Sequence, residues 1–256
     1  MPQSRRWLPF GTGPAEAEAR MFCLPFAGGG ASNFTRWVRR MPDVAIVPVQ
    51  YPGHETRIDE APYHCIEQML DALADAIAPL LDRPYMLFGY SMGARLAFGL
   101  IHRLVQRGHA APLCLMVAAH RAPDRVSSAA GADALPDPEL RQVLRNYGGM
   151  PDELFDDDDF CAMMLPLMRA DFGLAMQAVE LSPVACPIIA YAGIEDSAAT
   201  PLEMAQWQRF TNSQFRLRKF EGGHFFLRTA AGFEAALHDD IVTALRTARD
   251  QRLVSA

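Results

Sequence analysis

The sequence predicts an α/β fold, with a mostly parallel central sheet, helices on both faces and a helical insertion. Three observations support this fold class. Short apolar runs of strand length recur along the 256 residues, and segments with helical periodicity lie between them. Apolar strands that alternate with helices are typical of a parallel sheet covered on both sides. One stretch, 123–182, interrupts the alternation with several prolines and an acidic run.

We expect five buried strands and one edge strand. Phe215–Phe220 alternates apolar and basic residues, which is the pattern of a strand with one exposed face. The buried candidates are short apolar runs: Met21–Phe26, Ala45–Tyr51, Tyr85–Tyr90, Leu113–Ala119 and Pro187–Gly193.

Three long helices are predicted outside the insertion. Tyr63–Leu81 carries apolar side chains at spacings of three and four, which gives a helix with one apolar face. Ala94–Gly108 is strongly helical and ends at a glycine, as helices commonly do. The last helix is expected over Phe233–Arg249.

The stretch 123–182 is interpreted as an insertion over the carboxyl edge of the sheet, where α/β folds place their ligands. Its helical pieces carry Met163, Met164 and Met168, which could form an adaptable pocket wall or ordinary core. An ordinary strand–helix connection with extra helices is the alternative interpretation. The chain length suits one domain over residues 1–256, insertion included, better than two small domains.

Composition excludes several function classes. Thirty acidic and twenty-four basic side chains give a net charge of -6, which argues against a nucleic-acid partner. The five cysteines are scattered and never form a C-x-x-C pair, so neither a disulfide framework nor a zinc ribbon is indicated. No apolar run has the length of a signal peptide or a membrane span. We therefore expect a cytoplasmic protein that is not bound to a membrane.

Gly89-Tyr90-Ser91-Met92-Gly93 forms a G-x-S-x-G motif between a predicted strand and a predicted helix. This is the setting of the nucleophile elbow of α/β-hydrolases, where a strained turn exposes the serine. Flanking glycines avoid side-chain clashes where the strand and the helix approach. Ser91 is therefore the candidate nucleophile, and a purely structural tight turn is the alternative.

A serine nucleophile needs a histidine base, and the base needs an orienting carboxylate. His224 lies in a flexible loop after the last predicted strand, and the base comes last in the chain order of this fold. His120, which ends a strand, is the main rival.

The carboxylate should follow a strand between the serine and the histidine. Asp196 lies just after the strand that ends at Gly193, and it is the preferred acid. Glu195 is the neighbouring alternative, and Asp124 is a weaker one.

The oxyanion that develops in acyl transfer needs backbone N–H donors already in position. One is expected from Met92, directly after the nucleophile. The second is expected from Ala27, in the glycine-rich loop after the first strand. That loop lacks the spacing and the lysine of a phosphate-binding loop.

With these residues in place, the chain resembles the type II thioesterases, the free-standing editing enzymes of nonribosomal peptide and polyketide assembly lines. The resemblance covers nearly the whole chain from about residue 21, and the intervals between its motifs agree as well. Four blocks carry it: LPFAGGGAS (Leu24–Ser32), QYPGHETR (Gln50–Arg57), FGYSMGA (Phe88–Ala94) and EGGHFFL (Glu221–Leu227).

The chain departs from the family pattern in two places. The family usually has histidine where Tyr90 stands, which bears on the shape of the pocket rather than on the chemistry. The acid block keeps Asp196 but lacks the proline that often follows it.

The resemblance implies hydrolysis of acyl thioesters on the phosphopantetheine arms of peptidyl or acyl carrier domains, which clears misprimed or stalled chains. It implies a lid over 123–182, no metal or cofactor, and a monomer that serves siderophore or antibiotic synthesis. Two other functions share these residues: a generic esterase or lipase acting on small oxygen esters, and a non-catalytic ligand-binding protein of the same fold.

Overall fold

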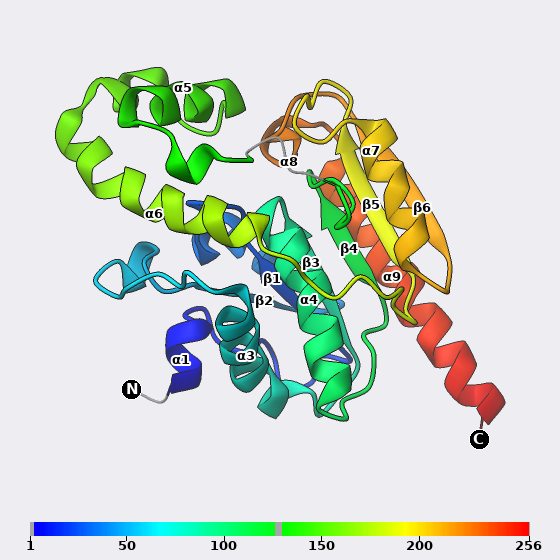
Figure 1. Ribbon diagram of the computed structural model, residues 1–256. Helices are drawn as coiled ribbons and strands as arrows, with labels where there is room; N and C mark the ends of the chain where they lie inside the picture. Colours follow the sequence, from blue (N-terminus) through cyan, green and yellow to red (C-terminus); the bar gives the residue numbers. More distant parts are fainter. Residues whose placement is uncertain (1–2, 126–129, 256) are drawn as a thin grey trace.

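A computed structural model describes residues 3–125 and 130–255 and contains a six-stranded sheet in which every neighbouring pair is parallel (Figure 1). The strand order is β2-β1-β3-β4-β5-β6. The predicted parallel sheet is confirmed. The strands are β1 (Arg20–Leu24), β2 (Ala45–Pro48), β3 (Tyr85–Tyr90), β4 (Leu115–Ala118), β5 (Ile188–Gly193) and β6 (Phe215–Phe220).

The strands lie where the apolar runs predict them. The bounds of β3 and β6 are as predicted, β2, β4 and β5 are shorter, and β1 begins one residue earlier than predicted and ends two residues earlier. β1 stops at Leu24 because Pro25 has no N–H to donate to a neighbouring strand. Strand β6 pairs only with β5 and is partly exposed along its length, so the predicted edge strand is confirmed.

Helices cover both faces of the sheet (Figure 1). One face packs against α1, α3 and α4, and the other packs against α2 and α9. The helices of the main body are α1 (Gln3–Trp7), α2 (Thr35–Arg40), α3 (Ile66–Ile77), α4 (Met92–Gln106), α7 (Pro201–Ala205), α8 (Phe226–Thr229) and α9 (Phe233–Ser255). Short 3₁₀ turns occur at Ala31–Phe34, Glu55–Arg57, Ala78–Leu80, Ala132–Ala134, Asp152–Asp156 and Gln206–Phe210. The last helix is longer than predicted because no glycine or proline interrupts it after Arg249.

The segment between β4 and β5, where the insertion is expected, contributes α5 (Asp137–Tyr147) and α6 (Asp158–Met176). Residues 126–129 of this segment lie outside the described residues. The acidic run begins α6, because the Asp157 side chain accepts a hydrogen bond from the Phe160 N–H at 3.0 Å. The two helices share a small core of their own: Ala132, Leu140, Leu144, Phe155, Cys161, Met164, Leu165, Met168 and Phe172.

The turn from β3 into α4 is tightly packed against backbone atoms. A side chain on Gly93 would place its Cβ 2.1 Å from the Leu24 carbonyl oxygen of β1. A side chain on Gly89 would place its Cβ 2.3 Å from the Gly93 carbonyl oxygen. Both neighbours are backbone atoms that cannot rotate away, so the two glycines of the motif are sterically required here.

No helix among residues 3–125 and 130–255 is long and apolar enough to cross a membrane.

We predict that Gly93→Ala lowers the free energy of unfolding by about 3 kcal/mol, because the added methyl group forces α4 away from β1. Urea unfolding followed by circular dichroism measures this. The matched control is Gly173→Ala in α6, where the nearest atom to the new Cβ would be 3.8 Å away. That change should leave stability equal or raise it by about 0.5–1 kcal/mol, as expected for alanine in a helix. An equal loss in both variants would contradict the steric explanation.

Candidate active site

Ser91 lies at the end of β3, in the turn that starts α4. Its backbone has φ 51° and ψ -119°, a conformation that few residues other than glycine adopt. The Ser91 N–H donates to the Ala118 carbonyl of β4 at 2.8 Å, which fixes the turn to the sheet. The side chain faces a cavity of about 190 Å³ between the sheet edge and the insertion.

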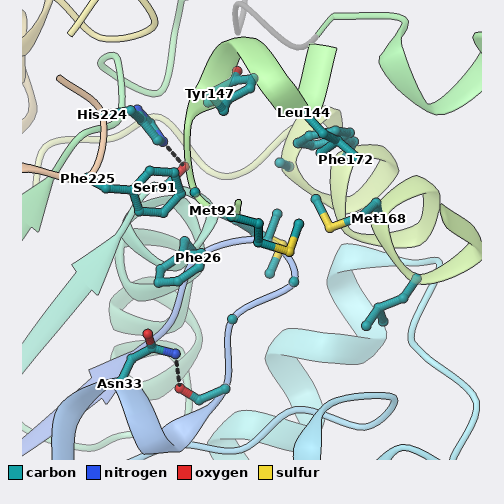
Figure 2. A pocket seen from close by; sticks show the side chains of 18 of the residues that line it. Phe26, Asn33, Ser91, Met92, Leu144, Tyr147, Met168, Phe172, His224 and Phe225 are labelled. Carbon is teal, nitrogen blue, oxygen red and sulfur yellow. Dashed lines mark hydrogen bonds between the residues drawn. The ribbon is translucent and has the colours of Figure 1, made fainter. Parts of the chain in front are cut away.

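His224 forms hydrogen bonds with both the nucleophile and the carboxylate, and the three residues lie in three separate loops. Its Nε2 accepts a hydrogen bond from Ser91 Oγ at 3.1 Å, as Figure 2 shows. Its Nδ1 donates to Asp196, with 3.0 Å to Oδ2 and 3.2 Å to Oδ1. A carboxylate can only accept, so this contact places the proton on Nδ1 and leaves the Nε2 lone pair facing the serine.

Asp196 follows β5 and is buried, with only 2% of its surface exposed. Its Oδ1 also accepts the N–H groups of Ala198 at 2.9 Å and Ala199 at 3.1 Å. These donors stabilise the ionised carboxylate away from water. Glu195 is exposed, and Asp124 forms an ion pair with Arg209 at 2.8 Å instead. The geometry therefore brings Asp196, and neither alternative, to the histidine.

His120, the rival base, lines the same cavity but forms no hydrogen bond with Ser91. Its Nδ1 donates to the Arg121 carbonyl at 2.6 Å. Burial, together with the charge of Arg95, lowers the pKa of His120 to about 4. An imidazole with so low a pKa is a weaker proton acceptor than an ordinary histidine.

Aromatic rings surround His224 and hold its loop. Tyr147, at the end of α5, lies 4.9 Å from the imidazole between ring centroids, and Phe225 lies 5.3 Å away. Tyr90 is fully buried and donates its hydroxyl to the His224 carbonyl. Burial raises the pKa of Tyr90 well above its usual value, so the hydroxyl keeps this donor proton.

Tyr90 was expected to bear on the pocket shape, but its side chain is not part of the cavity wall. It lies behind the histidine loop and packs edge-on against Phe26 at 5.7 Å. The tyrosine that replaces the family's histidine therefore affects how the His224 loop is held.

The two expected oxyanion donors, Ala27 and Met92, both line the cavity beside Ser91. Among the described residues, neither backbone N–H has a hydrogen-bond acceptor. The next amide, Gly28 N–H, donates instead to Asp171 Oδ2 of α6 at 2.7 Å. The loop that carries Ala27 is thus fixed by a side chain of the insertion.

The same carboxylate binds His54, a residue whose role the sequence did not reveal. His54 Nε2 lies 2.8 Å from Asp171 Oδ2, and Nδ1 lies 2.9 Å from the Pro52 carbonyl. Both partners can only accept, so the protonated imidazole satisfies both contacts. Burial lowers the pKa of His54, but the charge and hydrogen bond of Asp171, together with the Pro52 carbonyl and the charge of Glu55, outweigh it and the net pKa is raised. The QYPGHETR block therefore anchors α6 and the oxyanion loop together.

The cavity wall is mainly apolar (Figure 2). Met164 and Met168 line it and also belong to the core of the insertion, so both interpretations of the methionines hold for them. Met163 points to solvent, with 57% of its surface exposed. In the described part of the chain, no group of three or more His, Cys, Asp or Glu side chains is placed to hold a metal ion.

The parallel sheet, the strained serine turn and the hydrogen-bonded serine, histidine and aspartate define an α/β-hydrolase. The thioesterase domain family matches residues 19–241, and the chain belongs to this family. The fold class and the resemblance to type II thioesterases that the sequence predicted are both confirmed.

Several known proteins are similar to this chain along most of their length. The gramicidin S biosynthesis protein GrsT of Aneurinibacillus migulanus is 32% identical over 228 residues, 88% of this chain and 89% of its own. The structure of RedJ, a thioesterase from the prodiginine pathway of Streptomyces coelicolor, superposes with a TM-score of 0.82 at 36% identity, covering 90% of this chain and 92% of RedJ. BorB, a type II thioesterase from the borrelidin cluster, gives 0.81 at 32% identity, covering 93% and 97%.

We predict that His54→Ala lowers the free energy of unfolding by about 3 kcal/mol at pH 6, because it leaves the buried Asp171 carboxylate without its cation. The folded-state pKa of His54 is raised. Its extra stabilisation is therefore complete below the unfolded pKa and is lost as the pH rises through the folded one. Chemical unfolding at pH 6 and pH 9 should show a smaller difference from wild type at pH 9.

The control for this prediction is His64→Ala, an exposed histidine of the same connection. It should change stability by no more than about 0.5 kcal/mol at either pH. A His54 effect that is independent of pH would show that the imidazole is neutral in the folded protein.

Proposed function

We propose that this thioesterase hydrolyses acyl groups from the phosphopantetheine arms of carrier domains in nonribosomal peptide or polyketide synthases, and so clears misprimed or stalled chains. We further propose Ser91 as the nucleophile, His224 as the general base and Asp196 as its orienting acid. The observation that carries the proposal is the hydrogen-bonded sequence Ser91–His224–Asp196 in the wall of an apolar cavity.

In the first half-reaction, Ser91 Oγ attacks the thioester carbonyl while its proton moves to His224 Nε2. The Ala27 and Met92 N–H groups stabilise the oxyanion, and Met92 lies at the positive end of α4. Collapse of the tetrahedral intermediate breaks the C–S bond, and the thiol leaves with the proton from His224.

In the second half-reaction, water attacks the acyl-serine while His224 accepts its proton. The carboxylic acid leaves as Ser91 Oγ recovers that proton. Asp196 fixes the imidazole tautomer through both steps and stabilises the charged form. Its two backbone donors, Ala198 and Ala199, hold the carboxylate in place beside the imidazolium.

The insertion, about 123–182, would serve as the lid of a single domain over 1–256. It supplies much of the apolar wall that would receive the acyl chain, and its Tyr147 packs against His224. The protein is proposed to act as a monomer with carrier domains as its partners. Neither a nucleic acid nor a membrane is a proposed partner. The five cysteines are all free thiols, which supports a reducing, cytoplasmic location.

The first test is Ser91→Ala, which should lower kcat by about 10⁴–10⁶-fold because loss of the nucleophile disables the whole unit. The protein should still fold, since only a small hydroxyl at a turn is removed. Thiol release from an acyl thioester measures turnover, and circular dichroism measures folding. Retention of more than a few per cent of activity would remove Ser91 from the nucleophile role.

Substitutions of two neighbouring carboxylates test the assignment of Asp196 as the orienting acid. Asp196→Asn should lower kcat by up to about 10⁴-fold, because the amide favours the wrong histidine tautomer. Glu195→Gln removes an exposed carboxylate and should leave kcat within a few-fold. A greater loss in the glutamate variant would reverse the assignment.

The carrier partner is tested with one acyl group on three leaving groups. An acetyl group on a phosphopantetheinylated carrier protein should be hydrolysed with higher kcat/KM than acetyl-N-acetylcysteamine. The reacting thioester is the same in both substrates, so any gain comes from docking of the carrier. Contacts between the carrier and the enzyme can orient the thioester, which raises kcat as well as lowering KM. A generic esterase should prefer p-nitrophenyl acetate after correction for intrinsic reactivity. Equal corrected values for the two thioesters would contradict the carrier proposal and leave the hydrolase assignment intact.

A further inference from the structure

A small hollow adjoins the main cavity on the side of β4. Its volume is about 20 Å³. A hollow needs roughly 10–15 Å³ to hold one water molecule, so this one accommodates a single water and little else. It is lined by Ser91, Ala119, His120, Arg121, Tyr147, Ala198 and His224.

His120 lines this site and carries a buried hydrogen-bond acceptor. Its Nδ1 lies 2.6 Å from the Arg121 carbonyl, and a carbonyl can only accept, so the proton of the neutral ring is on Nδ1. The Nε2 lone pair is then unprotonated. Nε2 is buried and has no partner among the described residues, in a side chain that is 93% buried.

The ring stays neutral over the working pH range of an ordinary enzyme. Burial is the main cause of its low pKa of about 4, and the charges of Arg95, His224 and Arg121 lower the pKa further. His120 is therefore an acceptor of hydrogen bonds from neutral donors and does not compete with His224 for the proton of Ser91.

The Nδ1 contact with the Arg121 carbonyl holds the His120 ring, and neighbouring contacts fix the backbone that carries it. The His120 carbonyl accepts the Trp207 indole N–H at 2.7 Å, and Ala119 holds a positive φ of 53° directly before it. An unsatisfied buried acceptor costs stability of the order of a lost hydrogen bond. An unsatisfied acceptor on a residue that lines a hollow the size of one water favours a site for a donor molecule of that size.

We propose that His120 Nε2 accepts a hydrogen bond from the water that hydrolyses the acyl-Ser91 intermediate, and so positions it beside His224. This inference rests on the proposed function. The water directs one O–H to His120 and the other to His224 Nε2. Its oxygen lone pair then faces the acyl carbonyl.

The step balances with His120 unchanged. The water oxygen forms a bond to the acyl carbon, and the proton directed at His224 moves to its Nε2. The proton directed at His120 stays on the oxygen and leaves with the carboxylic acid. The C–Oγ bond of Ser91 breaks, and Oγ takes the proton back from His224. His120 therefore acts on deacylation and has no part in the attack of Ser91.

The experiment separates the two half-reactions in a His120→Asn variant. Asparagine keeps an N–H near the Arg121 carbonyl but has no acceptor at the position of Nε2. With p-nitrophenyl acetate, rapid mixing gives the acylation rate from the burst of nitrophenol and the deacylation rate from the steady state. We expect acylation within about twofold of wild type. Deacylation should slow by about tenfold, the effect of one lost hydrogen bond.

Two further observations distinguish this role from a structural one. Intact-protein mass spectrometry should show a larger steady-state fraction of acetyl-enzyme in His120→Asn than in wild type. His120→Gln should recover much of the deacylation rate, because its amide oxygen can accept a hydrogen bond near the position of Nε2.

The matched control is His102→Asn. His102 lies on α4 and also has a buried Nε2 without a partner among the described residues, but it lines neither cavity. Its replacement should leave both half-reactions unchanged.

Equal slowing of both half-reactions in His120→Asn would overturn the inference and assign His120 a purely structural role. An unchanged deacylation rate of the acetyl-enzyme would also overturn it. This holds even if deacylation slows for acyl groups that carry an amine or a hydroxyl. The proposed function fails separately, if Ser91→Ala still forms the acetyl-enzyme.

Discussion

The close approach of α4 to the ends of β1 and β3 is the constraint on which the site depends. Gly89 and Gly93 leave no room for a side chain, and Ser91 between them is held at a positive φ. This packing aims Oγ out of the sheet and places the Met92 amide, at the first turn of α4, beside it. The strain at Ser91 is tolerated because the surrounding helix and strands fix the turn from both sides.

The insertion takes part in the site as well as covering it. Asp171 of α6 holds the Gly28 amide next to Ala27 and binds His54 at the same oxygen. Tyr147 of α5 packs on the His224 ring. A displacement of these helices would therefore change both the shape of the acyl cavity and the position of the groups that perform the chemistry. Closure of the cavity and order in the site are physically coupled.

Local patterns were sufficient to predict the strands, the main helices and the residues that meet at the serine. Apolar runs and helical spacing report burial directly, and the chain order of this fold selects His224 and Asp196. The supporting contacts were beyond the sequence because they join distant segments: His54 to Asp171, and Tyr90 to the His224 carbonyl. The free Nε2 of His120 depends on a tautomer that only the neighbouring carbonyl decides. These contacts have no periodicity by which a pattern could reveal them.

A serine, histidine and aspartate alone do not distinguish a thioesterase from an esterase, so selectivity must come from what surrounds them. The larger cavity and the small hollow share four lining residues: Ser91, His120, Tyr147 and His224. In the proposed reaction, the acyl chain lies in the first and the water in the second, on either side of this shared wall. A bound acyl group then need not leave its apolar cavity to admit water. The acyl chain can be held firmly through both half-reactions, with the water positioned independently of its length.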